Sequence, residues 1–190
     1  MRRTVSLDER AAIANNNKAD LFISLHANAS SQAAARGAEI FYLSLAEYGE
    51  EARALAESDG QRILVIGGGT REIDLILWEM AQVRYLEQSA RLAEIIEQEL
   101  RSRLEMSPRA IQQAPFRVLV GANMPAVLVE MGFITNAAQE HQLASPAFQT
   151  ALVNALVDGI VRFRDHVEQR ARVVGGAGVP DAVSSNRERQ

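Results

Sequence analysis

Apolar residues follow two different patterns along the chain. Short continuous apolar runs are typical of strands buried on both faces, and apolar residues that recur every three or four positions are typical of helices with one buried side. The continuous runs predict strands at residues 21–26, 37–43, 116–120 and 126–133. The recurring positions predict helices at the start of the chain, at 45–58, at 72–104 and from Ser145 onward.

The predicted helices have recognisable ends. Ser6 and Glu9 form the S-x-x-E pattern of a capping box, in which each side chain satisfies a backbone N–H of the other residue. Ser145 and Pro146 suit the N-cap and the first position of the last helix. Pro108 is predicted to end the long central helix.

Apolar strands that alternate with long helices indicate an α/β fold. We expect three layers, with a largely parallel sheet flanked by helices on both faces. The chain opens on a core helix with no strand before it, which fits either a fragment of a larger domain or a small domain that begins with a helix. We expect the domain to span residues 1–168 and predict that residues 169–190 form a disordered tail.

Composition narrows the classes of function. The chain has 190 residues, of which 47% are hydrophobic and 23% charged, as in a single globular domain. No apolar run is long enough to span a bilayer. The net charge of −4 gives no general attraction to nucleic acid. The absence of cysteine excludes a disulfide scaffold, a cysteine zinc knuckle and a thiol nucleophile.

Two polar residues stand near the ends of predicted strands. His26 ends the run LFISLH, and Glu130 follows four apolar residues in AVLVEMGF. Because sites in such sheets gather at the carboxyl ends of strands, we expect both side chains at one rim. A buried carboxylate must be paired, be protonated or serve a metal-bound water. The spacing alone also fits a half-buried structural histidine, and an ion pair of Glu130 with Arg10 or Arg117.

Other candidates carry weaker signals. The glycines of residues 66–70 match no phosphate-binding motif and predict a loop. His141 and His166 are expected on the surface. Asp20 and Glu39 flank predicted strands, but we do not expect them at the rim that holds His26 and Glu130.

With their flanking residues, the two motifs become specific. The stretch SLDERAAIANNNKADLFISLHANAS, residues 6–30, resembles the block that ends in the His-Ala-Asn/Asp zinc motif of the zinc-dependent N-acetylmuramoyl-L-alanine amidases of the amidase-3 type, which cleave peptidoglycan. Residues 124–140, MPAVLVEMGFITNAAQE, look like the block with the family's catalytic glutamate. The resemblance covers about residues 4–165, and its intervening blocks fall in order at 36–44, 89–96 and 112–119.

The resemblance implies a role for each motif. His26 matches a zinc (Zn2+) ligand, and Glu130 matches the glutamate that acts as general base and acid toward a zinc-activated water. The bond cleaved would join the lactyl group of N-acetylmuramic acid to L-alanine of the stem peptide. Peptidoglycan as substrate implies a periplasmic or secreted location.

The resemblance also implies regulation. In regulated members an insertion, here residues 45–80, carries a helix that covers the zinc site until an activator protein binds. The apolar run IDLILWEMAQ, residues 73–82, is suited to packing against the rim or against a partner. Ordinary core packing around Trp78 is the alternative interpretation.

One departure from the family pattern is large. The family's other two zinc ligands, a histidine in a Gly-His-Gly-Gly-like strand end and a glutamate on the next helix, precede everything seen in this sequence. We therefore expect the N-terminal strands to be missing and zinc binding to be weak. The alternative functions are a catalytically inactive remnant or module that binds peptidoglycan or a regulator, and a scaffold that uses residues 73–82 as an interface.

Overall fold

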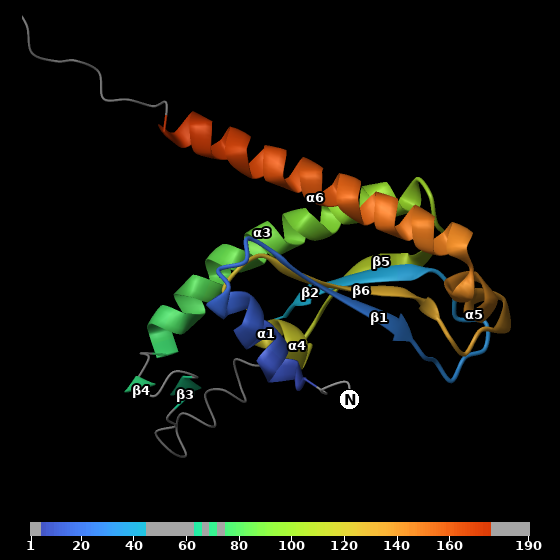
Figure 1. Cartoon of the computed structure of the whole chain (residues 1–190), viewed down its shortest axis with the longest axis horizontal. Coiled ribbons are helices and arrows are strands. Elements are labelled where there is room, and N and C mark those ends of the chain that lie inside the picture. Colours follow the sequence, from blue (N-terminus) through green and yellow to red (C-terminus); the bar gives the residue numbers. More distant parts are fainter. Residues whose placement is uncertain (1–4, 45–62, 66–68, 72–74, 176–190) are drawn as a thin grey trace, which may run out of the picture.

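The computed structural model describes residues 5–44, 63–65, 69–71 and 75–175. A four-stranded sheet lies between two layers of helices (Figure 1). The long helices α3 (Leu75–Arg101) and α6 (Pro146–Gly175) cover one face. The short helices α1 (Leu7–Asn16) and α4 (Arg117–Val120) lie against the other. The predicted α/β class with helices on both faces is confirmed.

The strands run β1 (Phe22–Asn28), β2 (Ala38–Leu43), β5 (Met106–Ala114) and β6 (Ala126–Phe133) along the chain. Their order across the sheet is β1-β6-β2-β5. The outer pairs, β1 with β6 and β2 with β5, are parallel, whereas the central pair of β2 and β6 is antiparallel. The amino end of β2 therefore lies beside the carboxyl end of β6.

Two hydrophobic clusters hold the layers together. On one face, Leu92 and Ile96 of α3 and Leu152 of α6 pack on Val127 and Val129 of β6. On the other face, the cluster is smaller and includes Val118, Leu119, Leu128 and Leu43. The sheet is thus buried on both faces along β6, which explains the continuous apolar run of that strand.

The capping box at the amino terminus is confirmed. The backbone N–H of Ser6 donates to Glu9 Oε2 at 2.8 Å, and the N–H of Glu9 donates to Ser6 Oγ at 3.3 Å. The last helix begins at Pro146 as predicted, but it continues through residues 169–175, which we had assigned to the tail. Residues 176–190 lie outside the described residues.

Three predictions about the middle of the chain were wrong. Residues 116–120 form the short helix α4 and not a strand, since a short apolar run with two buried residues fits either element. The central helix ends at Arg101, and Pro108 lies within β5, a strand that the sequence did not predict. Residues 69–70, predicted in a loop, belong to β4 (Gly69–Arg71), which pairs with β3 (Ile63–Val65).

A further helix, α5 (Ala137–Ala144), leads from β6 to α6. The predicted helix at residues 45–58 lies outside the described residues. Within the described residues, no helix has both the length and the apolar character needed to cross a membrane.

Candidate functional site

Three titratable side chains form a row across three neighbouring strands. The register pairs His26 of β1 with Glu130 of β6, and Glu130 with Glu39 of β2. Register partners on adjacent strands project to the same face, and adjacent strands lie about 4.8 Å apart. We call these three residues the strand-end row. The expectation that His26 and Glu130 share one rim agrees with this register.

Glu130 is a buried member of the row, and one of its carboxyl oxygens has no hydrogen-bond partner among the described residues. Its side chain is 7% exposed, and Oε2 accepts no hydrogen bond from the described residues. Burial raises the pKa of the Glu130 carboxyl, and the negative charge of Glu39 raises this pKa further. A close arginine would lower the pKa instead, so the raised pKa argues against an ion pair as the reason for burying this carboxyl.

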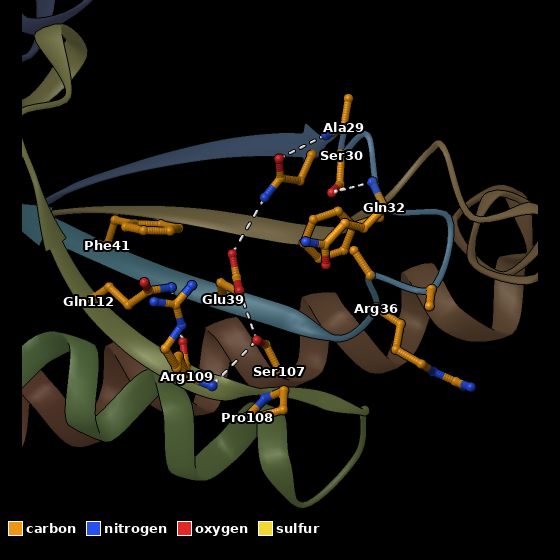
Figure 2. Close-up of a pocket in the computed structure, with 14 residues that line it drawn as sticks. Ala29, Ser30, Gln32, Arg36, Glu39, Phe41, Ser107, Pro108, Arg109 and Gln112 are labelled. Atoms are coloured by element: carbon orange, nitrogen blue, oxygen red, sulfur yellow. Dashed lines mark hydrogen bonds between the residues drawn. The ribbon is translucent and has the colours of Figure 1, made fainter.

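Glu39 is equally buried but fully engaged (Figure 2). Its Oε1 accepts a hydrogen bond of 2.7 Å from Ser107 Oγ on β5, and its Oε2 accepts one of 3.4 Å from Asn28 Nδ2 on β1. We had placed Glu39 away from the rim, and that prediction was wrong. Because β2 runs antiparallel to β6, the residue at the start of β2 meets the end of β6.

His26 is half-buried on β1. Its Nε2 lies 2.9 Å from Oγ of the buried Ser24, two residues earlier on the same face of the sheet. Burial lowers the pKa of the imidazole, and the positive charge of Arg10 lowers it further. The ring is therefore neutral near pH 7, which is the form that binds a metal.

The described residues fit part of a zinc site. His26 supplies one imidazole beside the unsatisfied carboxyl of Glu130, but no group of three or more metal-ligating side chains is found within the described ranges. His141 lies exposed on α5 and His166 half-buried on α6, and neither joins His26 and Glu130 in a metal-ligating group within the described residues. A catalytic zinc has three protein ligands, so this part of the chain supplies an incomplete set.

A cavity of about 630 Å³ adjoins the strand-end row on the side of β5 (Figure 2). Its walls come from the ends of β1, β2 and β5 and from the loop between β1 and β2. That loop is held in place, because Asn136 Nδ2 donates to the carbonyls of Ala33 and Ala35 at 3.2 and 3.3 Å. The N–H of Ser30 donates to Thr135 Oγ1 at 3.0 Å. The cavity is thus part of the folded structure.

These features define an α/β domain whose titratable side chains gather at strand ends, the usual place for a site in this class. A family model described as N-acetylmuramoyl-L-alanine amidase (Amidase_3) matches residues 2–162. The chain therefore belongs to the Amidase_3 family.

Curated relatives agree with this assignment. The chain is 29% identical to N-acetylmuramoyl-L-alanine amidase AmiC of Neisseria meningitidis serogroup B over 163 residues, which are 84% of this chain and 39% of AmiC. It is 30% identical to N-acetylmuramoyl-L-alanine amidase AmiA of Escherichia coli K12 over 164 residues, 84% of this chain and 57% of AmiA. The chain thus spans about two-fifths to three-fifths of the length of these relatives.

Solved structures are similar as well. An N-acetylmuramoyl-L-alanine amidase from Clostridium difficile 630 superposes with a TM-score of 0.59 and 27% identity, over 85% of this chain and 66% of that chain. The amidase AmiC2 of Nostoc punctiforme gives a TM-score of 0.59 at 22% identity, over 86% and 68% of the two chains, and shows likeness of fold alone.

Sequence reasoning found two members of the strand-end row and missed the surroundings. Glu39 and its partner Ser107 were not predicted, because the antiparallel pairing of β2 and the existence of β5 were not. A usable signal was the position of Glu39 in an otherwise apolar strand, AEIFYL. A carboxylate there must find hydrogen-bond donors on a neighbouring strand.

Proposed function

We propose that this chain contributes the catalytic glutamate and one zinc ligand of a peptidoglycan hydrolase. The reaction is cleavage of the amide between the lactyl group of N-acetylmuramic acid and L-alanine of the stem peptide. Membership of the family supports the reaction class. The single observation that supports the residues is the register of His26 with the buried, unsatisfied carboxyl of Glu130.

In this proposal Glu130 handles the proton. Its carboxylate takes a proton from the attacking water and delivers it to the departing amine of L-alanine. The raised pKa suits both steps, because a carboxyl that holds its proton more firmly is a stronger base and can still act as the acid. The neighbouring Glu39 has both oxygens occupied by Ser107 and Asn28, so it is not free to take this role.

His26 would hold the metal through its neutral imidazole. A bound zinc ion would polarise the amide carbonyl and lower the pKa of water at the site. The hydroxyl of Ser24, 2.9 Å from Nε2, restricts the orientation of the ring. The peptidoglycan substrate implies a periplasmic or secreted location, and the family resemblance implies an activator protein; the segment that would respond to it lies largely outside the described residues.

A second candidate function is binding without turnover. The incomplete ligand set within the described residues favours a module that binds peptidoglycan or an amidase regulator. The cavity beside Glu39 would serve such binding equally well. The two functions differ because hydrolysis requires zinc and the Glu130 carboxyl, whereas binding without turnover does not.

The test incubates zinc-loaded and zinc-depleted chain with purified peptidoglycan and measures released stem peptides by mass spectrometry. We expect zinc-dependent release that is lost in Glu130→Gln and strongly reduced in His26→Ala. His141→Ala is the matched control, since this exposed imidazole lies on α5. Sedimentation with peptidoglycan but no release at any zinc concentration would contradict the hydrolase and favour the binding module. Neither sedimentation nor release would contradict both.

A further inference from the structure

The strand β5, at one edge of the described sheet, carries a bulge directly opposite Glu39. The register pairs Ala38 with Met106 and then Ile40 with Ile111, so residues 107–110 of β5 face the single residue Glu39. Bulges re-aim side chains and are frequent next to active sites. The side chains of Ser107, Pro108 and Arg109 all line the cavity. We call residues 107–110 the β5 bulge.

The β5 bulge is held in a defined position. Gly37 has a φ of 94°, and a Cβ there would lie 2.3 Å from the backbone N of Ser107, so only glycine allows this close approach. The N–H of Arg109 donates to Ser107 Oγ at 3.4 Å, and Gln112 Nε2 donates to the carbonyl of Arg109 at 3.1 Å. The main chain on both sides of Arg109 is therefore fixed.

The two arginines that line the cavity differ in availability. Arg36 forms an ion pair of 2.6 Å with Glu105 and points away from the cavity in Figure 2. Arg109 lies beside Gln112 on the cavity wall and makes no ion pair with any residue that the structure describes. Glu39 forms no ion pair with Arg109, and its two oxygens accept hydrogen bonds from Asn28 and Ser107. Arg109 thus offers a positive charge to a ligand.

We propose that the β5 bulge forms a specificity subsite in which Arg109 binds a carboxylate of the substrate's peptide portion. This inference rests on the proposed function. β5 lies two strands from β6 in the sheet, which places the subsite about 10 Å from Glu130 at a spacing of about 4.8 Å per strand. An extended peptide rises about 3.3–3.6 Å per residue, so Arg109 meets the second or third residue beyond the scissile amide.

The chemistry of this ligand is specific. The guanidinium of arginine binds a carboxylate through two parallel hydrogen bonds, which an amide or an ammonium group cannot accept in the same way. Stem peptides differ in whether each of these two residues carries a free carboxylate. The second residue is isoglutamate or its amide isoglutamine, and the third is diaminopimelate, with an extra carboxylate, or lysine.

Calorimetric titration of the whole chain with soluble stem tripeptides tests the subsite without any need for turnover. Four tripeptides combine isoglutamate or isoglutamine with diaminopimelate or lysine, and so identify which carboxylate is bound. We expect loss of the recognised carboxylate to weaken binding about tenfold, as for one charge-assisted contact. Arg109→Ala should abolish this preference, and Arg109→Lys should restore part of it.

Arg36→Ala is the matched control, because it removes the cavity's other arginine and should keep the preference. Unchanged melting temperatures would show that the variants are folded. Equal affinity of the wild-type chain for all four peptides, no measurable binding, or a preference that survives in Arg109→Ala would each overturn the subsite. A preference that depends on Arg109 in a chain that never releases peptides from peptidoglycan would contradict the proposed hydrolase and leave the subsite standing.

Discussion

Glu130 and Glu39 are register partners on antiparallel strands, and both are buried, yet donors reach only one of them. Glu39 accepts hydrogen bonds from Ser107 and Asn28, whereas Glu130 Oε2 accepts none within the described residues. The pair therefore consists of a hydrogen-bonded side chain, Glu39, beside a carboxyl, Glu130, that holds its proton more firmly than usual. Two like residues side by side acquire different chemistry from their neighbours alone.

The first prediction concerns the charge of Glu39. Glu39→Gln removes a negative charge from beside Glu130, so the pKa of the Glu130 carboxyl should fall toward its ordinary value. Burial would still hold this pKa above that value, because burial is the larger cause. The measurement is a carbon-13 NMR titration of the Glu130 carboxyl. Glu105→Gln, at an exposed carboxylate paired with Arg36, should leave the titration unchanged.

The second prediction concerns the pH dependence of stability. Because the folded pKa of Glu130 is raised, the folded state binds this proton more tightly than the unfolded state, and stability falls as pH rises above the ordinary carboxyl pKa of about 4.3. In the Glu130→Gln variant this side chain cannot ionise, so this fall in stability with rising pH is absent. The free energy of unfolding of Glu130→Gln relative to wild type should therefore improve from acid to neutral pH. Urea unfolding at both pH values measures it, and a pH-independent difference would refute it.

The third prediction concerns the close approach at Gly37. Gly37→Ala places a Cβ 2.3 Å from the backbone of Ser107 at a φ of 94°, so the strands must separate at the β5 bulge. We expect a loss of about 3 kcal/mol in the free energy of unfolding. Gly121→Ala is the control, since its φ is −87° and its Cβ would lie 3.4 Å from Ala11 Cβ. The control should change stability by less than about 1 kcal/mol; equal effects at both positions would disprove the strain.

The fourth prediction concerns the core between α3 and the sheet. Leu92 is fully buried in the larger hydrophobic cluster, and Leu92→Ala should cost about 3 kcal/mol by leaving a cavity. Val153 on α6 is 54% exposed, and Val153→Ala should stay within about 0.5 kcal/mol. Thermal or urea unfolding compares the two variants, and a small loss for Leu92→Ala would mean that the α3 layer packs loosely.

The sequence predicted β1, β2 and β6, the strands that contain apolar runs. β6 is continuously apolar because clusters pack on both of its faces, and its end therefore made Glu130 conspicuous. His26 was found in the same way at the end of β1. The register between these two residues needed the structure, because it depends on which strands are neighbours.

The sequence could not predict β5 for physical reasons. It lies at one edge of the described sheet and has an irregular burial pattern. It also contains a proline and the bulge, so neither alternation nor a continuous apolar run marks it. Because β5 was not predicted, Ser107 and Arg109 were not recognised as residues near the site. The run at 116–120 was misassigned because Val118 and Leu119 are buried whether the segment is a strand or a single helical turn. The glycine directly after this run, Gly121, was the available signal that the segment is a helical turn.

The two hydrogen bonds of Glu39 have a consequence for local unfolding. Their donors, Asn28 and Ser107, sit on β1 and β5, the two outermost strands of the described sheet. Outer strands fray with less free energy than central ones. Fraying of either outer strand would remove one of the two hydrogen bonds of Glu39 while the core between α3, α6 and β6 stays intact. Amide exchange in β1 and β5 would thus report the integrity of this network long before global melting.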